Sequence, residues 1–269
     1  MAELKEKEIV EVKDSTAHCT YCGNEIEDIT QVYCESCGQE LAKYVSSDIE
    51  REAKMSRSSS AILQITGAAL FGALSIVLSA FLAPIIPRVP GWGIAYFDPV
   101  SIVWVMCFFI FGTKAGLLCC GIGTLGLMPF DPFAPIGPLM KLFATLSLII
   151  IPIILLRLYK VEEGRKNSQK IKNPLNFVIT GILGIFLRIV VMLFFNVLLF
   201  LTLFSDYFAY VNLDFLRTTS YLLGTSDVTG WSAVIIVVVL INTETSLWDL
   251  LIPYALTFGL RLDEKFDIW

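Results

Sequence analysis

Four cysteines near the N-terminus have the spacing of a metal site. They lie in two short segments, Cys19-Thr-Tyr-Cys22 and Cys34-Glu-Ser-Cys37, and a glycine follows each segment. Each Cys-x-x-Cys turn directs two thiolates at one ion, and the glycine permits the positive φ angle that such a turn needs. Four thiolates complete the tetrahedron that Zn²⁺ prefers and leave no position for water, so we predict a structural zinc site rather than a catalytic one. The alternative is four cysteines without a metal, which the repeated spacing disfavours.

These cysteines belong to a polar region, residues 1–58, that we expect to form a separate zinc ribbon and linker. The region begins without the apolar core of a signal peptide, so we expect it in the reducing cytosol, where free thiols persist. His18 is the single histidine of the chain. It is surplus to the four-cysteine site, and histidine-based catalysis elsewhere is therefore excluded. Residues 40–58 are expected to be a polar linker or helix that reaches an anionic inner leaflet.

A second group of chemically capable residues lies inside long apolar stretches. An ionisable side chain at membrane depth costs several kcal/mol unless it faces protein or water, so each is a candidate for function. At about 1.5 Å per residue, Lys141 lies roughly 5 Å from the outer end of its helix, Asn196 about 12 Å and Asn242 about 16 Å. Three different helices thus bring polar groups to one outer layer, which predicts a binding cavity open to the exterior.

Some of these polar residues have more than one interpretation. Asn242, Thr245 and Asp249 share one helix face by their spacing, whereas Glu244 points away from that face and is a candidate partner for Arg188. For Arg188 we favour a structural ion pair or a role at the inner leaflet over ligand contact. Lys141 either faces the cavity or extends to the outer interface.

The elements that hold these residues are expected to be six membrane helices in residues 59–269. The chain of 269 residues is 55% hydrophobic, with a mean hydropathy of +0.70, and the apolar excess follows residue 59. We predict an all-α membrane protein, a six-helix bundle preceded by the zinc ribbon. The second and third stretches are shorter than the roughly 20 residues of a perpendicular crossing, so they should be tilted, irregular or sheltered by neighbours. The stretches are 61–86, 98–112, 115–130, 138–158, 175–204 and 231–258.

Loop charge gives the expected orientation. The connection after the fourth stretch is strongly basic, whereas the candidate outer connections carry only Arg88 and Arg217. By the positive-inside rule the basic loop is cytoplasmic. Six crossings then place both termini on the cytoplasmic side of the cell membrane. The net charge of −5 and the scattered basic residues argue against nucleic acid as a partner. The basic residues of the inner loop are Arg157, Lys160, Arg165, Lys166, Lys170 and Lys172.

Two further features concern contacts. The outer connections 83–97 and 129–137 are rich in proline, glycine and aromatic residues, and they either cover a pocket or are tight turns at the interface. In the first helix, four small residues form overlapping small-xxx-small pairs that let another helix approach closely, within the chain or from a partner. These small residues are Ala68, Ala69, Gly72 and Ala73.

Ordered motifs over residues 60–260 resemble the substrate-capturing S components of energy-coupling factor (ECF) vitamin transporters, most nearly the riboflavin group. Phe97-Asp98-Pro99-Val100 and the later Phe-Gly-x-x-Ala-Gly turn at 111–116 are similar to the family's second helix. Pro135-Ile136-Gly137 before Lys141 resembles its fourth, Val191-Met192 with Asn196 its fifth, and Asn242 falls where the sixth carries an asparagine.

The resemblance implies six helices with cytosolic ends and a ligand pocket near the outer face. It also implies a first helix that docks, through Ala69-x-x-x-Ala73, on a transmembrane coupling subunit driven by two ATPases. No phosphate-binding loop motif occurs in this chain, so ATP hydrolysis must come from those partners. The substrate-binding positions that the resemblance and the polar layer together indicate are Asp98, Lys141, Asn196, Asn242 and Thr245.

Two departures from the riboflavin pattern bear on the ligand. Lys141 stands where the family has a ligand-binding asparagine, and Thr245 stands where it has a lysine. A different or more anionic compound is therefore an alternative to riboflavin. We predict a non-enzymatic, substrate-capturing subunit for a vitamin-like molecule.

Two other functions are alternatives. In the first, the chain is a membrane-anchored adaptor whose zinc ribbon recruits a cytosolic partner. The second, a membrane enzyme, is disfavoured because Cys107, Cys119 and Cys120 resemble small packing residues and no histidine lies in the membrane part.

Overall fold

The computed structural model describes residues 17–18, 22, 25–26, 33, 35–38, 42–82, 85–89, 94–131, 133–158, 167–211 and 228–266. The chain divides into a smaller N-terminal unit that ends at Ile62 and a larger helical unit that begins at Leu63. Each unit is described by itself.

The N-terminal unit contains a short β-hairpin. Strand β1 (Ala17–His18) pairs antiparallel with β2 (Glu25–Ile26), with Ala17 opposite Ile26. Cys22 lies between the strands, and Gly38, which follows Cys37, has the positive φ of 69° that the turn was expected to need. Cys19 and Cys34 lie outside the described residues, so the zinc site stays a prediction.

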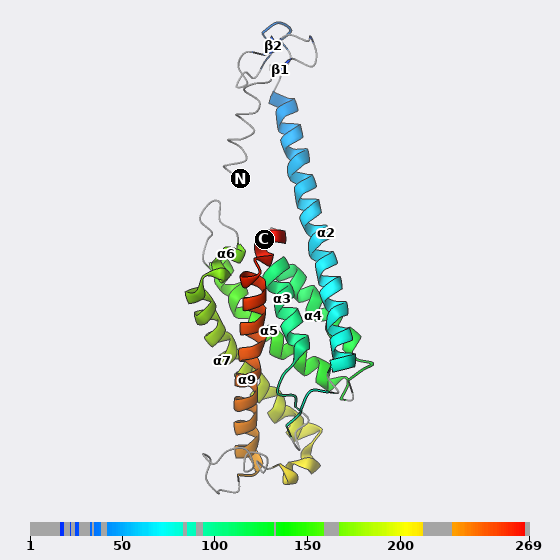
Figure 1. Cartoon of the computed structure of the whole chain (residues 1–269), viewed down its shortest axis with the longest axis vertical. Helices are drawn as coiled ribbons and strands as arrows, with labels where there is room; N and C mark the ends of the chain where they lie inside the picture. Colours follow the sequence, from blue (N-terminus) through cyan, green and yellow to red (C-terminus); the bar gives the residue numbers. More distant parts are fainter. Residues whose placement is uncertain are drawn as a thin grey trace. The chain divides into compact units, whose positions relative to one another are not determined.

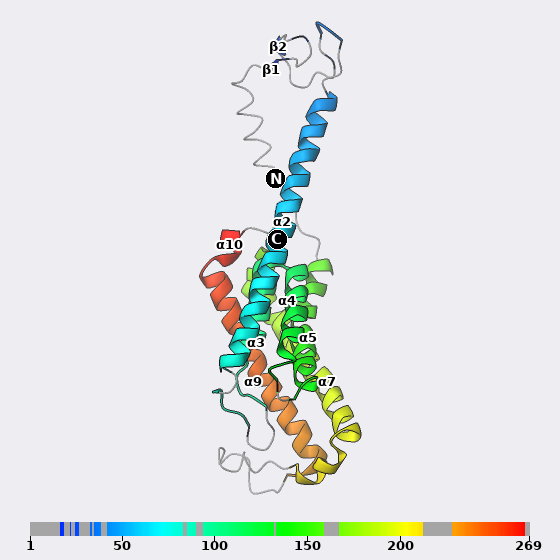
Figure 2. The same ribbon diagram turned by 90° about the vertical axis from the view of Figure 1, so that its right-hand side faces the viewer.

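The helical unit is dominated by long apolar helices, which run side by side in Figures 1 and 2. Four described segments are long and apolar enough to cross a membrane, so the chain has the character of a multi-pass membrane protein. They are residues Ser59–Leu82 of α2 (Ala42–Leu82), α5 (Ile136–Leu158), α7 (Pro174–Thr202) and α9 (Gly230–Gly259).

Two shorter apolar helices, α3 (Pro99–Phe111) and α4 (Thr113–Leu127), occupy the second and third predicted stretches. At about 1.5 Å per residue they are roughly 20 and 22 Å long, less than the ~30 Å hydrocarbon core. Every residue of α3 except Met106 is buried. The sequence is therefore apolar all round because α3 is surrounded by other helices, chiefly α9, α4 and α5.

Local sequence fixes both ends of α3. The side chain of Asp98 accepts a hydrogen bond from the backbone N of Val100 at 3.1 Å, and Pro99 occupies the first helical position. An aspartate cap followed by proline is a strong start signal for a helix. Gly112 separates α3 from α4 with a φ of 90°, a conformation that side chains other than glycine rarely adopt.

Short elements close the two ends of the helical unit. Helices α6 (Asn167–Lys172) and α10 (Leu262–Phe266) lie at one end, and the 3-10 helix η1 (Ser205–Tyr210) lies at the other (Figures 1 and 2). Lys172 joins α6 to α10, because its Nζ donates to Glu264 at 2.6 Å and lies 3.6 Å from Asp263.

The small-residue strip on α2 is divided between a buried face and an exposed face. Ala68 is fully buried, and a Cβ added to Gly72 would lie 2.8 Å from Ile122 of α4. These two residues pack within the chain, because residues four apart share one helix face and that face meets α4. Ala69 and Ala73, on the adjacent face, are exposed.

Candidate functional site

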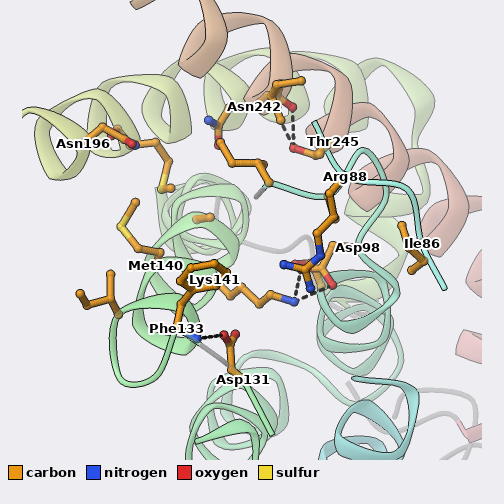
Figure 3. Close-up of a pocket in the computed structure, with 18 of the residues that line it drawn as sticks. Ile86, Arg88, Asp98, Asp131, Phe133, Met140, Lys141, Asn196, Asn242 and Thr245 are labelled. Carbon is orange, nitrogen blue, oxygen red and sulfur yellow. Dashed lines mark hydrogen bonds and ion pairs between the residues drawn. The ribbon is translucent and has the colours of Figure 1, made fainter. Parts of the chain in front are cut away.

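Most of the predicted polar residues of the helical unit meet in one cavity of about 1180 Å³. Its walls come from the first turns of α3 and α5, the second half of α7, and α9 (Figure 3). The two proline-rich connections also contribute lining residues, among them Ile86, Phe97, Phe130 and Phe133. Those connections therefore border the cavity. The substrate-binding candidates Asp98, Lys141, Asn196, Asn242 and Thr245 all line it.

One polar cluster joins α5 to the start of α3. The Nζ of Lys141 lies 3.1 Å from Oδ1 and 3.0 Å from Oδ2 of Asp98. Their side chains are 27% and 13% exposed, so the lysine is held against the cavity wall instead of extending to the outer interface. Figure 3 shows Arg88, from the connection before α3, pointing toward the same pair.

Asp98 accepts most of the hydrogen bonds in this cluster. Besides Lys141 and the backbone N of Val100, it accepts a hydrogen bond from Oγ of Ser101 at 3.3 Å. Ser101 in turn accepts from Oγ1 of Thr145 on α5 at 3.2 Å. A carboxylate with four such contacts holds its lysine in a fixed place.

A second polar cluster joins α7 to α9 through Arg188. Its Nη1 donates to Oδ2 of Asp249 at 2.6 Å, its Nη2 to Oγ1 of Thr245 at 3.0 Å, and its Nε to Oδ1 of Asn242 at 3.2 Å. Arg188 is 6% exposed and Asp249 is fully buried. The partner of Arg188 is thus Asp249 rather than Glu244, because Asp249 shares the helix face of Asn242 and Thr245.

Asn242 and Thr245 serve mainly to hold this arginine. Nδ2 of Asn242 donates to the carbonyl oxygen of Val238 at 2.8 Å, and Oγ1 of Thr245 donates to that of Ile241 at 2.8 Å. Their oxygens accept from Arg188, which itself lines the cavity. The sequence interpretation favoured a structural role for Arg188 over ligand contact and did not include it among the substrate-binding residues. The common face of three polar residues on α9 was the signal that a cation lies opposite them.

Asn196 contributes from the third side of the cavity. Its Nδ2 donates to the carbonyl oxygen of Met192, one turn earlier on α7, at 2.8 Å. Around it the wall is apolar, formed by Met140, Ala144 and Met192. The cavity thus combines apolar surface with a few polar groups from separate elements, which is the usual composition of a small-molecule site.

The described part of the chain contains no group of three or more metal-ligating side chains close enough to hold an ion. Cys107, Cys119 and Cys120 are buried between α3 and α4, within the apolar core. The polar residues of the cavity are suited to hydrogen bonding and ion pairing with a bound molecule.

A comparison with protein-family models decides the class of protein. The model described as "ECF transporter, substrate-specific component" matches residues 63–260. This chain belongs to that family. Comparisons with curated proteins and with solved structures gave no match.

The match covers the helical unit from its first residue and includes every residue of both polar clusters. An ECF substrate-specific component is a transporter subunit and not an enzyme. It binds a small-molecule substrate and associates with the ECF membrane and ATPase subunits. The cavity is the place in this S component where a small molecule has both space and polar partners.

Proposed function

We propose that this S component captures a vitamin-like molecule in the cavity between α3, α5, α7 and α9, and that separate ATPase subunits power its uptake. One observation carries the proposal. Lys141, Asn196 and Asn242, from three different helices, line a single cavity of about 1180 Å³. Polar groups in hydrocarbon are otherwise unfavourable, so a wet recess explains their presence. Riboflavin is the first candidate ligand because the ordered motifs resemble that group most nearly.

The cavity opens toward the exterior in this proposal, and α2, α3, α4, α5, α7 and α9 each cross the membrane. Support comes from the distribution of basic residues, because the helix ends remote from the cavity carry most of them. The positive-inside rule places those ends in the cytoplasm, together with both termini. The described basic residues at those ends are Lys114, Arg157, Lys170, Lys172, Arg261 and Lys265.

The exposed residues Ala69 and Ala73 are the proposed contact with the transmembrane coupling subunit. Small side chains let a partner helix approach closely. Ala68 and Gly72 support this contact indirectly, because they pack α2 against α4.

The N-terminal unit is proposed to be a structural zinc ribbon with Cys19, Cys22, Cys34 and Cys37 as ligands. The exposed positions of Cys22 and Cys37 and the positive φ of Gly38 are compatible with two metal-binding turns. The metal would supply folding free energy that so short a segment cannot obtain from a core.

The test is ligand binding by purified full-length protein in detergent. Riboflavin is titrated while tryptophan fluorescence is recorded, and small molecules released by denaturation are identified by mass spectrometry. A saturable signal or a stoichiometric released compound is expected. The absence of saturable riboflavin binding, together with the absence of any released compound, would contradict substrate capture.

A further inference from the structure

We propose that the ligand of this cavity is an organic anion, bound through N–H groups of Arg188 and Lys141 and packed against aromatic and thioether side chains. This inference rests on the proposed function and specifies the chemical class of its substrate. It follows from which hydrogen-bonding groups of the cavity are already used.

The carboxylate of Asp98 already has several partners within the chain. It accepts hydrogen bonds from the backbone N of Val100, from Ser101 and from Lys141, whose Nζ also lies 3.0 Å from its Oδ2. Two carboxylate oxygens offer about four lone-pair sites, so Asp98 has little capacity left to accept a hydrogen bond from a ligand.

The oxygens of the second cluster are used in the same way. Oδ1 of Asn242 and Oγ1 of Thr245 each accept from the guanidinium of Arg188. Asp249 lies behind Arg188, is fully buried and does not line the cavity. The α9 side of the cavity therefore presents Arg188 and not its counter-ion.

Arg188 and Lys141, in contrast, have N–H groups without a hydrogen-bond partner among the described residues. A guanidinium has five N–H groups, and three of those of Arg188 have partners among the described residues. An ammonium has three, and both contacts of Lys141 go to the two oxygens of Asp98. At least two N–H groups of Arg188 and one of Lys141 remain for a bound molecule.

The charged residues that line the cavity carry a net positive charge. Its positive residues are Arg88, Lys141 and Arg188, and its negative residues are Asp98 and Asp131. Oδ1 of Asp131 accepts from the backbone N of Phe133 at 2.8 Å. In Figure 3 Asp131 lies in the turn before α5, at the far side from Asn242 and Thr245. An anionic group between Arg188 and Lys141 meets surplus donors and avoids that carboxylate.

The remaining walls define the rest of the molecule. Phe97, Phe130, Phe133, Met140 and Met192 are apolar and border the cavity. A volume of about 1180 Å³ accommodates a vitamin-sized body in addition to its charged group. A small inorganic anion would leave those surfaces unused, so the inferred class is an amphipathic carboxylate or phosphate ester.

Pairs of probe molecules that are similar in shape but differ in charge test whether the cavity prefers an anion. Full-length protein in lipid nanodiscs is titrated with riboflavin 5′-phosphate against riboflavin, pantothenate against panthenol, biotin against biotinamide, and nicotinate against nicotinamide. The anionic member of at least one pair should bind ten-fold or more tightly than its neutral counterpart. The pair that shows the difference tells carboxylate from phosphate.

Two variants test the residues, and a third is the control. Lys141→Gln, and the double variant Arg188→Gln with Asp249→Asn, should each weaken binding of the anion at least ten-fold and leave the neutral member nearly unchanged. The double variant removes both charges of the buried pair together, so no lone charge is left to unfold the protein. Lys114→Gln removes an exposed positive charge at the remote end and should leave both affinities unchanged.

The possible outcomes distinguish failure of the anionic ligand class from failure of the proposed substrate capture. Saturable binding in which neutral members are equal or tighter overturns the anionic class and leaves substrate capture standing. If no probe binds but a compound is released from the purified protein, its charge at pH 7 decides: an anion supports the inference and a neutral compound overturns it. If nothing binds and nothing is released, both fail.

Discussion

At the scale of single residues, the arrangement around Arg188 shows what helix spacing does and does not predict. That Asn242, Thr245 and Asp249 share a face follows from the sequence, and on that face all three accept a hydrogen bond from Arg188. Which acid pairs with the arginine depends on the rotation of α7 against α9. Sequence does not contain that rotation, and the partner predicted from the sequence, Glu244, was wrong.

Asp249→Asn tests this ion pair. Removing one partner leaves a buried charge without its counter-ion, which typically lowers the free energy of unfolding by about 3–5 kcal/mol. We expect thermal unfolding in detergent to shift clearly downward. Glu244→Gln is the matched control, and its effect should stay within about 0.5 kcal/mol. Equal destabilisation by the two variants would contradict the assignment of Asp249.

At the scale of elements, the positions of the helices were predicted well and their contacts less well. Continuous apolar stretches located α3, α4, α5, α7 and α9 because helices buried in protein or lipid are apolar all round. The short α3 was expected to be tilted, irregular or sheltered, and the structure shows shelter, with Trp104 and Phe108 fully buried. The small residues of α2 were identified correctly as a close-contact strip. The rotation of α2 decides which of these small residues face α4 and which are exposed, and the sequence does not contain that rotation.

Two substitutions on α2 separate its two faces. Gly72→Leu forces a large side chain toward Ile122 and should destabilise the isolated protein by about 1–3 kcal/mol. Ala73→Leu lies on the exposed face and should leave thermal unfolding unchanged but weaken co-purification with the transmembrane coupling subunit. If Ala73→Leu leaves that complex intact, the proposed docking surface is wrong.

The contact between α6 and α10 should depend on pH. The hydrogen bond from Lys172 lowers the pKa of Glu264 below its ordinary 4.5, and the same bond raises the pKa of Lys172 above 10.5. Because the pKa of Glu264 is lowered in the folded state, its contribution to stability is present above the pKa of the unfolded chain and is lost as the pH falls. Because the pKa of Lys172 is raised, its contribution is present below about pH 10.5 and is lost at higher pH.

Hydrogen-exchange protection factors of α10 should therefore be highest near neutral pH and decline below pH ~4.5. Glu264 is exposed and Lys172 is partly exposed, so solvent screens the ion pair and the change is small. Lys172→Met should remove the acid decline, whereas Lys265→Gln, a charge-matched change on α10, should retain it. The same acid decline in Lys172→Met would show that another group is responsible.

At the scale of the whole molecule, the sequence predicted two unlike parts, and the family match coincides with one of them. Residues 63–260 belong to the ECF substrate-specific components, while the cysteine-rich region lies before the match. Composition alone marked the change, because apolar residues are concentrated after residue 59. The identity of the ligand could not be predicted, since it depends on which donors remain unpaired once the helices pack.

Deleting residues 1–58 separates the transporter from an adaptor. In the transporter account the deletion removes one bound zinc ion per chain, measured by elemental analysis, and leaves ligand affinity unchanged. Cys22→Ser with Cys37→Ser in the full chain should likewise abolish bound zinc without affecting the ligand. Loss of ligand binding in the deletion variant would show that the cavity depends on the N-terminal unit.

The central claim is that a small molecule occupies the space between Lys141, Asn196 and Asn242. Native mass spectrometry of the full-length protein, compared with Ala144→Trp, tests it most directly, because Ala144 lines the cavity and a tryptophan there intrudes into the ligand space without changing any charge. The account predicts one small molecule bound to the native protein and none bound to the variant. Equal occupancy in both, or an empty native protein under conditions that supply vitamins, would contradict it.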